Sequence, residues 1–224
     1  MPSRVVQLTS SDQHPFNGYL AEPTGSVRGA VIVIQEIFGV NAHIREVCDS
    51  YAAAGYRALA PALFDRVEPG IELGYGGADM MQGVEIARGK LRREETLRDL
   101  QAAIDYLGSN QKIGVVGYCF GGLMSWLVAC ELKGIACAVS YYGGGVSGEM
   151  ERTAKVPVIF HFGKLDAHIP MEQVSAVEQA CPGSEVHVYD ADHGFNCNHR
   201  ASFDAAAADL ARQRSLDFFA THLP

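Results

Sequence analysis

Residues 117–122 are the segment of this chain best suited to covalent chemistry. They read Gly-Tyr-Cys-Phe-Gly-Gly, so Cys119 has a glycine two positions away on either side. The stretch before them, Lys112–Tyr118, predicts a strand, and Leu123–Leu132 predicts a helix. A nucleophile on a sharp turn between strand and helix needs such glycines, because side chains there would keep the two elements apart. The pattern predicts a nucleophile elbow with Cys119 as nucleophile. The alternative is a glycine-rich turn that buries an inert cysteine.

The same turn would supply groups that stabilise negative charge. Cys119 would stand at the start of a helix, where the helix dipole favours a thiolate and the backbone N–H of Phe120 is free to bind an oxyanion. A second N–H is expected just after the first buried strand, Gly29–Gln35, which makes Ile37 the candidate. The sequence therefore predicts an oxyanion hole formed by the backbone of Ile37 and Phe120.

An acid and a base follow Cys119 in the order that this kind of site requires. Asp166 comes shortly after the predicted strand Val156–Phe162, and His193 comes shortly after the predicted strand Glu185–Tyr189. In open α/β sheets, sites form beyond the carboxyl ends of the strands. We therefore predict that His193 is the base and that Asp166 orients it, although each residue alone could equally be a loop residue without a catalytic role.

Other residues of suitable type are less well placed. They lie outside the elbow, within strands, or on the same loop as a better candidate: Ser125, Ser140, His161, His168, Asp190 and Asp192. Cys197 and His199 flank the His193 loop, and with Asp192 they could suggest a metal site. Because Cys-x-His is not a characteristic zinc spacing, we expect no metal and no cofactor.

Glu36 is an acidic residue at the end of an otherwise apolar strand, close to the expected position of Cys119. A carboxylate beside the thiol could control its protonation. The alternative is a partly solvated strand-end carboxylate that pairs with Arg45 or another cation.

Short apolar runs bounded by turn residues alternate with segments of helical periodicity, which predicts an α/β fold with a mainly parallel sheet and helices on both faces. Arg4–Thr9 and Phe16–Ala21 are expected to form an antiparallel hairpin. The other expected strands are Tyr56–Ala60 and Ile135–Tyr141. The other expected helices are a short one ended by Gly55, one ended by Gly108, Met171–Cys181 and Ser202–Thr221.

The segment Asp65–Arg93 has many glycines and poor periodicity. We predict a long loop with a short helix near Met80–Arg88. Long loops on compact enzymes are often binding loops. No repeat or linker interrupts the chain, so one domain is expected over residues 1–224.

The 224 residues carry a formal net charge of -8 and are 48% hydrophobic, an ordinary globular composition. The absence of a Lys/Arg cluster argues against nucleic acid and anionic membranes as partners. No signal peptide or membrane-spanning run is recognisable, so we expect a cytoplasmic protein, either a monomer or a small homo-oligomer, with its six cysteines reduced.

The sequence resembles the dienelactone hydrolase family. The segments that carry the resemblance are Gln35–Asn41 (QEIFGVN), Gly117–Gly122, Tyr141–Gly143, His193–Phe195, the Asp166 loop and Ser215–Phe218. The resemblance implies an α/β-hydrolase fold without a large lid domain, and a triad of Cys119, His193 and Asp166. It further implies that Glu36 contacts the thiol at rest and that substrate binding frees Glu36 to help generate the thiolate.

The family resemblance also implies an arginine clamp for a substrate carboxylate, for which Arg88 and Arg200 are the candidates in this chain. Phe38, Tyr142 and Phe195, which lie in matching segments, are the further candidates for substrate binding.

The nucleophile itself restricts the substrate. A thiolate leaves a tetrahedral intermediate more readily than an alkoxide does, so attack on a simple alkyl ester tends to reverse. Enol lactones, aryl esters and thioesters avoid this, because their leaving groups are stabilised anions. The sequence thus predicts hydrolysis of an activated ester or enol lactone through a thioester acyl-enzyme. A general carboxylesterase or thioesterase is the alternative on the same scaffold, and a redox-sensing thiol protein is a third.

Overall fold

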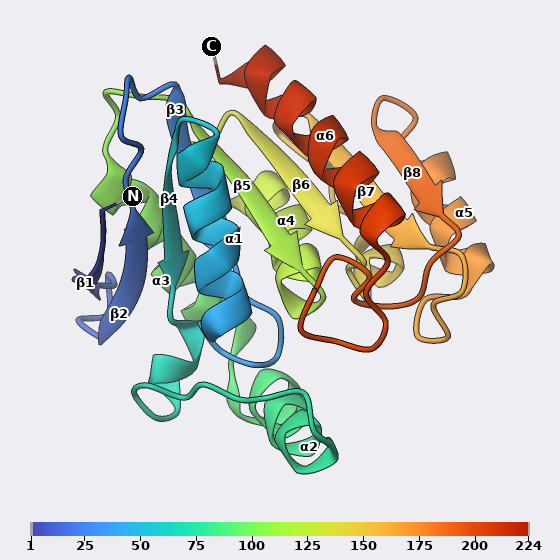
Figure 1. Cartoon of the computed structure of the whole chain (residues 1–224), viewed down its shortest axis with the longest axis horizontal. Helices are drawn as coiled ribbons and strands as arrows, with labels where there is room; N and C mark the ends of the chain where they lie inside the picture. Colours follow the sequence, from blue (N-terminus) through green and yellow to red (C-terminus); the bar gives the residue numbers. More distant parts are fainter. Residues whose placement is uncertain (1, 224) are drawn as a thin grey trace.

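The computed structural model describes residues 2–223, which form an α/β fold around one eight-stranded sheet of order β1-β2-β4-β3-β5-β6-β7-β8 (Figure 1). The strands are β1 (Ser3–Thr9), β2 (Pro15–Ala21), β3 (Gly29–Ile34), β4 (Tyr56–Pro61), β5 (Ile113–Tyr118), β6 (Cys137–Tyr141), β7 (Val158–Gly163) and β8 (Glu185–Tyr189). β1 and β2 form the expected antiparallel hairpin, and every strand from β4 to β8 along the sheet runs parallel to its neighbour. The predicted mainly parallel sheet is confirmed.

The central strands are buried on both faces, as their continuous apolar sequences predict. All residues of β3, β5, β6 and β7 are buried. Register then aligns their carboxyl ends, because Ile34 pairs with Gly117 and Tyr118 pairs with Tyr141. The residues that follow these strands therefore emerge along one edge of the sheet.

Helices cover both faces of the sheet. They are α1 (Ala42–Ala53), α2 (Gly77–Glu85), α3 (Arg93–Leu107), α4 (Phe120–Glu131), α5 (Met171–Ala180) and α6 (Ala205–His222). Figure 1 shows α1 and α6 in front of the sheet, and α3, α4 and α5 behind it. The side chain of Asn41 caps α1 by accepting from the backbone N–H of Ile44, 3.3 Å away. Gly108, with φ 78°, ends α3 as predicted.

Helices α4 and α6 each begin three residues away from the predicted start. α4 begins at Phe120 and not at Leu123, so the helix starts directly after Cys119. α6 begins at Ala205 and not at Ser202, because the Asp204 side chain accepts from the N–H of Ala207 at 2.8 Å and so fixes the first turn.

The prediction of a long loop over Asp65–Arg93 was wrong in extent. The segment holds the end of a 3-10 turn, η1 (Leu63–Arg66), followed by α2 and a π-helical turn, η2 (Ile86–Lys90). Only residues 67–76 lack regular structure before α2 begins. Glycines at four positions of residues 74–83 obscured the helical periodicity of this region. α2 projects beyond the edge of the sheet (Figure 1).

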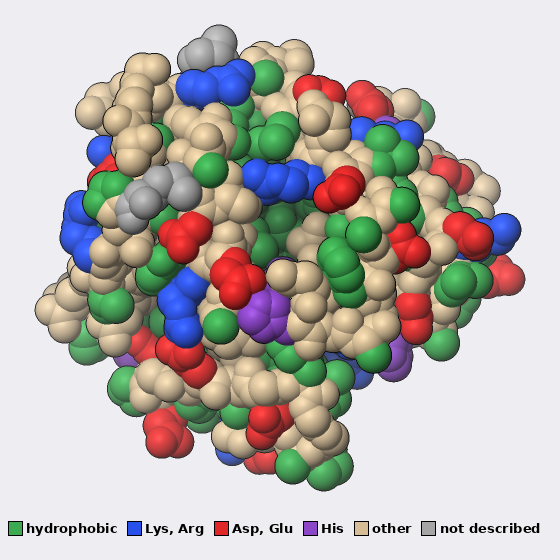
Figure 2. Space-filling view, viewed as in Figure 1, with side chains coloured by type: hydrophobic (Ala, Val, Ile, Leu, Met, Phe, Trp, Pro, Cys, Tyr) green, Lys and Arg blue, Asp and Glu red, His purple; other side chains and the backbone are tan. Residues whose placement is uncertain are grey.

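The face seen in Figure 2 carries acidic and basic side chains interspersed with one another, with no continuous basic area in view. Within residues 2–223, no helix has both the length and the apolar character needed to cross a bilayer.

Candidate active site

Cys119 has a strained backbone, which is the geometry that the elbow pattern predicts. Its φ of 56° and ψ of -113° lie in a region that residues with side chains rarely adopt. The strain is sustained by close packing of the strand against the helix. A Cβ on Gly117 would lie 1.9 Å from the carbonyl oxygen of Gly121, and a Cβ on Gly121 would lie 2.4 Å from that of Ile34. No residue other than glycine fits either position.

The start of α4 leaves the N–H of Phe120 without a partner in the helix, as the predicted oxyanion donor requires. The carbonyl oxygen of Cys119 accepts from the N–H groups of Gly122 and Leu123, at 2.9 and 3.3 Å. The N–H of Phe120 is at the first position of the helix, where no carbonyl of the helix can reach it. Phe120 and Ile37 both line the cleft that holds Cys119. Their joint action on an oxyanion stays a prediction.

Asp166 and His193 meet as the sequence predicts. The Nδ1–H of His193 donates to Oδ2 of Asp166 at 2.7 Å, and the backbone N–H of His168 donates to Oδ1 at 2.8 Å. The two loops are also joined by the N–H of Leu165, which donates to the carbonyl of Ala191 at 3.0 Å. Asp166 is therefore a buried, doubly hydrogen-bonded carboxylate that fixes the imidazole.

The ionisation of Asp166 and the protonation of His193 depend on each other. Burial is the largest influence on Asp166 and opposes its ionisation, but the hydrogen bond and charge of His193, together with His168, outweigh it and hold the pKa of Asp166 below its ordinary value. Burial likewise opposes protonation of His193, but the hydrogen bond to Asp166 and the interaction with Cys119 outweigh burial and raise the pKa of His193 to about 10. The arrangement therefore favours an imidazolium beside the Cys119 sulfur at neutral pH.

These residues open into a cleft of about 740 Å³, which we call the Cys119 cleft. Its lining includes Met80, Val84, Arg88, Phe120, Leu123, His168 and Arg200 in addition to Cys119, His193 and Ile37. α2 and η2 supply apolar side chains and Arg88, the start of α3 supplies Arg93, and the loop before α6 supplies Arg200. Arg88 and Arg200 are thus both placed where a bound anion could reach them.

The carboxylate of Glu36 faces Arg200 in this structure. Nη1 of Arg200 lies 3.5 Å from Oε1 of Glu36, and Gly194 makes room for the guanidinium, because a Cβ there would be 2.4 Å from Nη1. Arg45, the cation named from sequence, pairs instead with Glu72 at 2.7 Å. Burial raises the pKa of Glu36 against the opposing influence of Arg200. The resting contact between Glu36 and the thiol stays a prediction.

Three of the expected substrate-binding residues do not line the cleft. Phe38, Tyr142 and Phe195 are 1%, 0% and 0% exposed, so in this structure they support the site from behind. The ring of Tyr142 lies 5.1 Å from that of His193 and 5.3 Å from that of Phe195, measured between centroids. In this structure they pack around His193, and their contact with substrate stays a prediction.

The competing residues have structural roles. Ser125 and Ser140 donate to the carbonyl oxygens of Gly121 and Gly122, each at 2.9 Å. His161 is a buried residue of β7, with Nδ1 2.8 Å from the hydroxyl of Tyr189. Asp190 and Asp192 are exposed.

Sequence reasoning missed two contributors to the site. It considered His168 only as a base, whereas its backbone N–H holds Asp166 and its ring meets that of His193 edge-on at 5.3 Å. Tyr75 lies against Phe38, with ring centroids 4.6 Å apart, and beneath the Arg200 guanidinium. No local pattern could have identified Tyr75, because it lies in an irregular glycine-rich segment.

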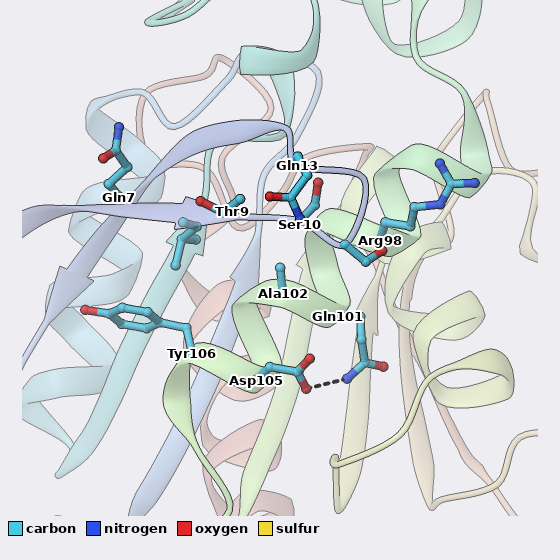
Figure 3. A pocket seen from close by; sticks show the side chains of 11 residues that line it. Gln7, Thr9, Ser10, Gln13, Arg98, Gln101, Ala102, Asp105 and Tyr106 are labelled. Atoms are coloured by element: carbon cyan, nitrogen blue, oxygen red, sulfur yellow. Dashed lines mark hydrogen bonds between the residues drawn. The ribbon is translucent and has the colours of Figure 1, made fainter.

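A second groove, of about 470 Å³, lies between the β1–β2 turn and α3 (Figure 3). It is lined by polar side chains such as Gln7, Ser10, Gln101 and Asp105, the last two joined by a 2.9 Å hydrogen bond. Its lining includes no cysteine or histidine, the residue types on which the predicted triad depends.

The sheet topology, the elbow and the acid and histidine beyond consecutive strands define an α/β-hydrolase. The dienelactone hydrolase family model matches residues 16–223, and the chain belongs to that family. It is a hydrolase of the carboxymethylenebutenolidase type. A relative from Synechocystis is 38% identical over 92% of both chains, and the carboxymethylenebutenolidase of Pseudomonas putida is 34% identical over 98% of this chain and 97% of its own.

Solved structures agree with this assignment. A Klebsiella pneumoniae crystal structure aligns with a TM-score of 0.82 at 29% identity, covering 98% of this chain and 99% of the other. A dienelactone hydrolase-like promiscuous phosphotriesterase from metagenomic libraries, at 21% identity, aligns over 100% of both chains with a TM-score of 0.79, and that likeness concerns the fold alone.

Proposed function

We propose that this protein hydrolyses enol lactones and related activated esters, with Cys119 as nucleophile, His193 as base and acid, and Asp166 as the residue that orients His193. The observation that carries the proposal is the strained backbone of Cys119 beside a histidine whose other nitrogen bonds a buried aspartate at 2.7 Å. An inert buried cysteine would not require a left-handed backbone at the start of a helix, and a thiol that only senses oxidants would need neither His193 nor Asp166.

The reaction begins when the Cys119 sulfur attacks the carbonyl carbon. The carbonyl oxygen takes up negative charge and accepts hydrogen bonds from the N–H groups of Phe120 and Ile37. The imidazolium of His193 then protonates the departing oxygen, and the C–O bond breaks to leave a thioester on Cys119. Water, deprotonated by His193, attacks the thioester, and the thiolate leaves as the acid product forms.

The leaving ability of the Cys119 thiolate restricts which leaving groups the substrate can carry. Because the thiolate is itself a good leaving group, the first intermediate proceeds forward only when the substrate releases a stabilised anion. An enolate released from a lactone meets this condition, as do a phenolate and a thiolate. The carboxymethylenebutenolidase relatives act, by their name, on a butenolide that also carries a carboxymethylene group.

A carboxylate on the substrate fits the cationic side of the cleft. Arg88 extends from η2 and Arg200 from the loop before α6, on a chain whose net charge is -8. A guanidinium binds a carboxylate through two parallel hydrogen bonds. We infer that Arg88 and Arg200 bind the substrate carboxylate and orient the lactone toward Cys119.

The test measures kcat/KM for dienelactones, neutral aryl esters and thioesters with the wild type and four variants. Cys119→Ala abolishes turnover of all substrates. Arg88→Ala and Arg200→Ala each raise KM for acidic substrates about 30-fold and change KM for neutral ones little, because a charge-assisted bidentate contact contributes about 2 kcal/mol. Arg92→Ala is the control, since Arg92 is exposed and outside the cleft lining.

Full activity of Cys119→Ala contradicts the nucleophile. Equal, small effects of both arginine variants on acidic and neutral substrates contradict the clamp and leave a general esterase. A preference for thioesters over lactones favours the thioesterase alternative.

A further inference from the structure

A cluster of three metal-ligating side chains lies beside the Cys119 cleft. One ligand atom each from Glu36, His43 and Cys197 lies within 4.8 Å of the other two. The three side chains are 1%, 3% and 0% exposed. They come from separate parts of the chain: the turn after β3, the first turn of α1, and the loop between β8 and α6.

Two of the three carry a buried polar atom without a partner. Oε2 of Glu36 and Nε2 of His43 have no hydrogen-bond partner among the described residues. A buried polar atom without a partner costs free energy, so such atoms usually meet a ligand, a water molecule or an ion. That two of them belong to one cluster indicates that the cluster binds something.

The orientation of His43 suits metal binding. Its Nδ1 lies 3.2 Å from Oδ1 of Asn198, an amide oxygen that can only accept, so Nδ1 carries the proton and Nε2 keeps a free lone pair. Metal-binding histidines are commonly held in this way, with the second nitrogen donating to an oxygen of the protein.

We propose that Oε2 of Glu36, Nε2 of His43 and Sγ of Cys197 bind one divalent cation of the zinc class. Zinc accepts sulfur, imidazole nitrogen and carboxylate oxygen together, at about 2.0 to 2.3 Å in a tetrahedral arrangement. Ligand atoms in such a tetrahedron lie about 3.3 to 3.8 Å apart, so closing the cluster requires each pair to approach by about 1.5 Å or less. The fourth position is left to water.

Charge and protons balance on binding. The S–H bond of Cys197 breaks, the sulfur keeps the electron pair and forms the bond to the metal, and the proton passes to solvent. The thiolate and the carboxylate then offset the two positive charges of the ion. Oε1 of Glu36 stays available to Arg200, whose contact is on that oxygen.

A metal ion reaches the inner cluster through an exposed pair of side chains, His199 and Glu46. Nε2 of His199 lies 2.9 Å from Oε2 of Glu46, and both residues are exposed. With His43 they form a second group whose ligand atoms lie within 4.8 Å of one another. An ion from solvent meets this outer group first and passes to the inner cluster, where a thiolate binds it more strongly.

Occupancy inhibits hydrolysis, a consequence that rests on the proposed function. The ion holds Glu36 in place and ties it to the loop of Cys197, whose carbonyl accepts from the N–H of Arg200 at 3.1 Å. Neither Glu36 nor Arg200 can then adjust to a substrate.

The first experiment titrates Co²⁺ and then Zn²⁺ into the Cys119→Ala protein, in which the elbow thiol cannot bind metal. One equivalent of Co²⁺ binds with a near-ultraviolet thiolate-to-cobalt absorption, which Zn²⁺ displaces. Cys197→Ser removes the absorption, and His43→Gln weakens affinity at least tenfold. Cys181→Ser, which alters a half-buried cysteine at the end of α5 and outside the cluster, leaves the titration unchanged.

An absorption that persists in Cys197→Ser, or its absence in the parent variant, overturns the site. Binding that survives Cys197→Ser but is lost in His199→Ala places the ion on the outer group and also overturns it. Circular dichroism of each variant, together with Cys197→Ala as a second substitution, separates loss of metal from loss of fold.

The second experiment tests the consequence in protein with Cys119 present. Zn²⁺ lowers kcat/KM on an aryl ester, a chelator restores it, and Cys197→Ser needs at least tenfold more Zn²⁺ for the same inhibition. Binding without inhibition contradicts the regulatory consequence. Should the protein hydrolyse no ester, the proposed function fails, whereas the metal site still stands on the cobalt titration.

Discussion

At the scale of single residues, the behaviour of Cys119 depends on what surrounds it. The raised pKa of His193, about 10, arises because the hydrogen bond to Asp166 and the neighbouring sulfur outweigh burial. Glu36 faces Arg200 in this arrangement, and His193 is the protonated group beside the sulfur. This is the organisation expected of an activated nucleophile.

This charge pairing predicts the pH dependence of alkylation. Because His193 carries a proton beside the sulfur, the reaction of Cys119 with iodoacetamide is expected to depend less steeply on pH between pH 8 and pH 6 than that of a free thiol. A free thiol of ordinary pKa, about 8.5, slows roughly 80-fold over the same range. Alkylation quenched at set times and followed by peptide mass spectrometry gives the rate of alkylation at Cys119, with glutathione as the reference thiol. A slope equal to that of glutathione would show that the ion pair does not form.

Glu36 provides a second prediction at this scale. Glu36→Gln keeps the shape of the side chain and removes its ability to accept a proton, so kcat should fall at least ~100-fold while the fold persists. The measurement is kcat together with the thermal midpoint of the same variant. Near-normal kcat with a lowered midpoint would mean that Glu36 serves only as the partner of Arg200.

At the scale of elements, the cleft depends on how closely α2 approaches the turn after β3. Gly83 lies in α2, and a Cβ there would be 2.1 Å from the carbonyl oxygen of Ile37. This contact joins the helix that forms one wall of the cleft to Ile37, the residue whose N–H is the predicted second oxyanion donor. A glycine in a helix usually weakens it, so its presence here is explained by the close approach.

Gly83→Ala should therefore displace α2 or the Ile37 peptide and lower kcat/KM by about 100-fold, as a shift of about 1 Å in a catalytic group can. Gly89→Ala is the matched control, because Gly89 lies in the same region and a Cβ added there would have no other atom within 4 Å. The control should keep activity. Equal kcat/KM in both variants would show that the approach of α2 does not position the oxyanion donor.

At the scale of the whole molecule, stability depends on buried histidines as well as on the apolar core. His161 is 0% exposed and contacts the hydroxyls of Tyr189 and Ser215, at 2.8 and 3.1 Å. Burial lowers the pKa of His161 well below its ordinary value, with His187 and Arg214 acting in the same direction. The folded protein therefore holds this ring neutral where the unfolded chain protonates it.

Holding His161 neutral makes the folded protein less stable at acid pH. Below pH of about 6.5 the unfolded chain binds a proton that the folded chain does not, so the stability contributed by neutral His161 is lost as pH falls. Between pH 6.5 and 5 this one group should cost about 2 kcal/mol, or a fall of roughly 4–8 °C in Tm. Thermal melts of wild type and His161→Gln at both pH values check this, and the variant should show a smaller fall. Parallel falls in both proteins would assign the acid sensitivity to other groups.

The sequence alone determined the features that depend on neighbours along the chain. The glycines around Cys119 specify the elbow, because no side chain fits between β5 and α4. The apolar runs specify the central strands and hence the edge at which Asp166 and His193 emerge, since parallel strands end together. Family-typical spacing then indicated the chemistry before any contact was known.

The tertiary structure decided what depends on residues distant in the chain. It paired Glu36 with Arg200 and not with Arg45, buried Phe38 behind the cleft, and gathered Glu36, His43 and Cys197 into one cluster. Burial and partner choice depend on the packing of three or more segments at once, which no local pattern records. The sequence could therefore predict which residues act on a bound ester, whereas only the fold showed which side chains surround the carboxylate of Glu36.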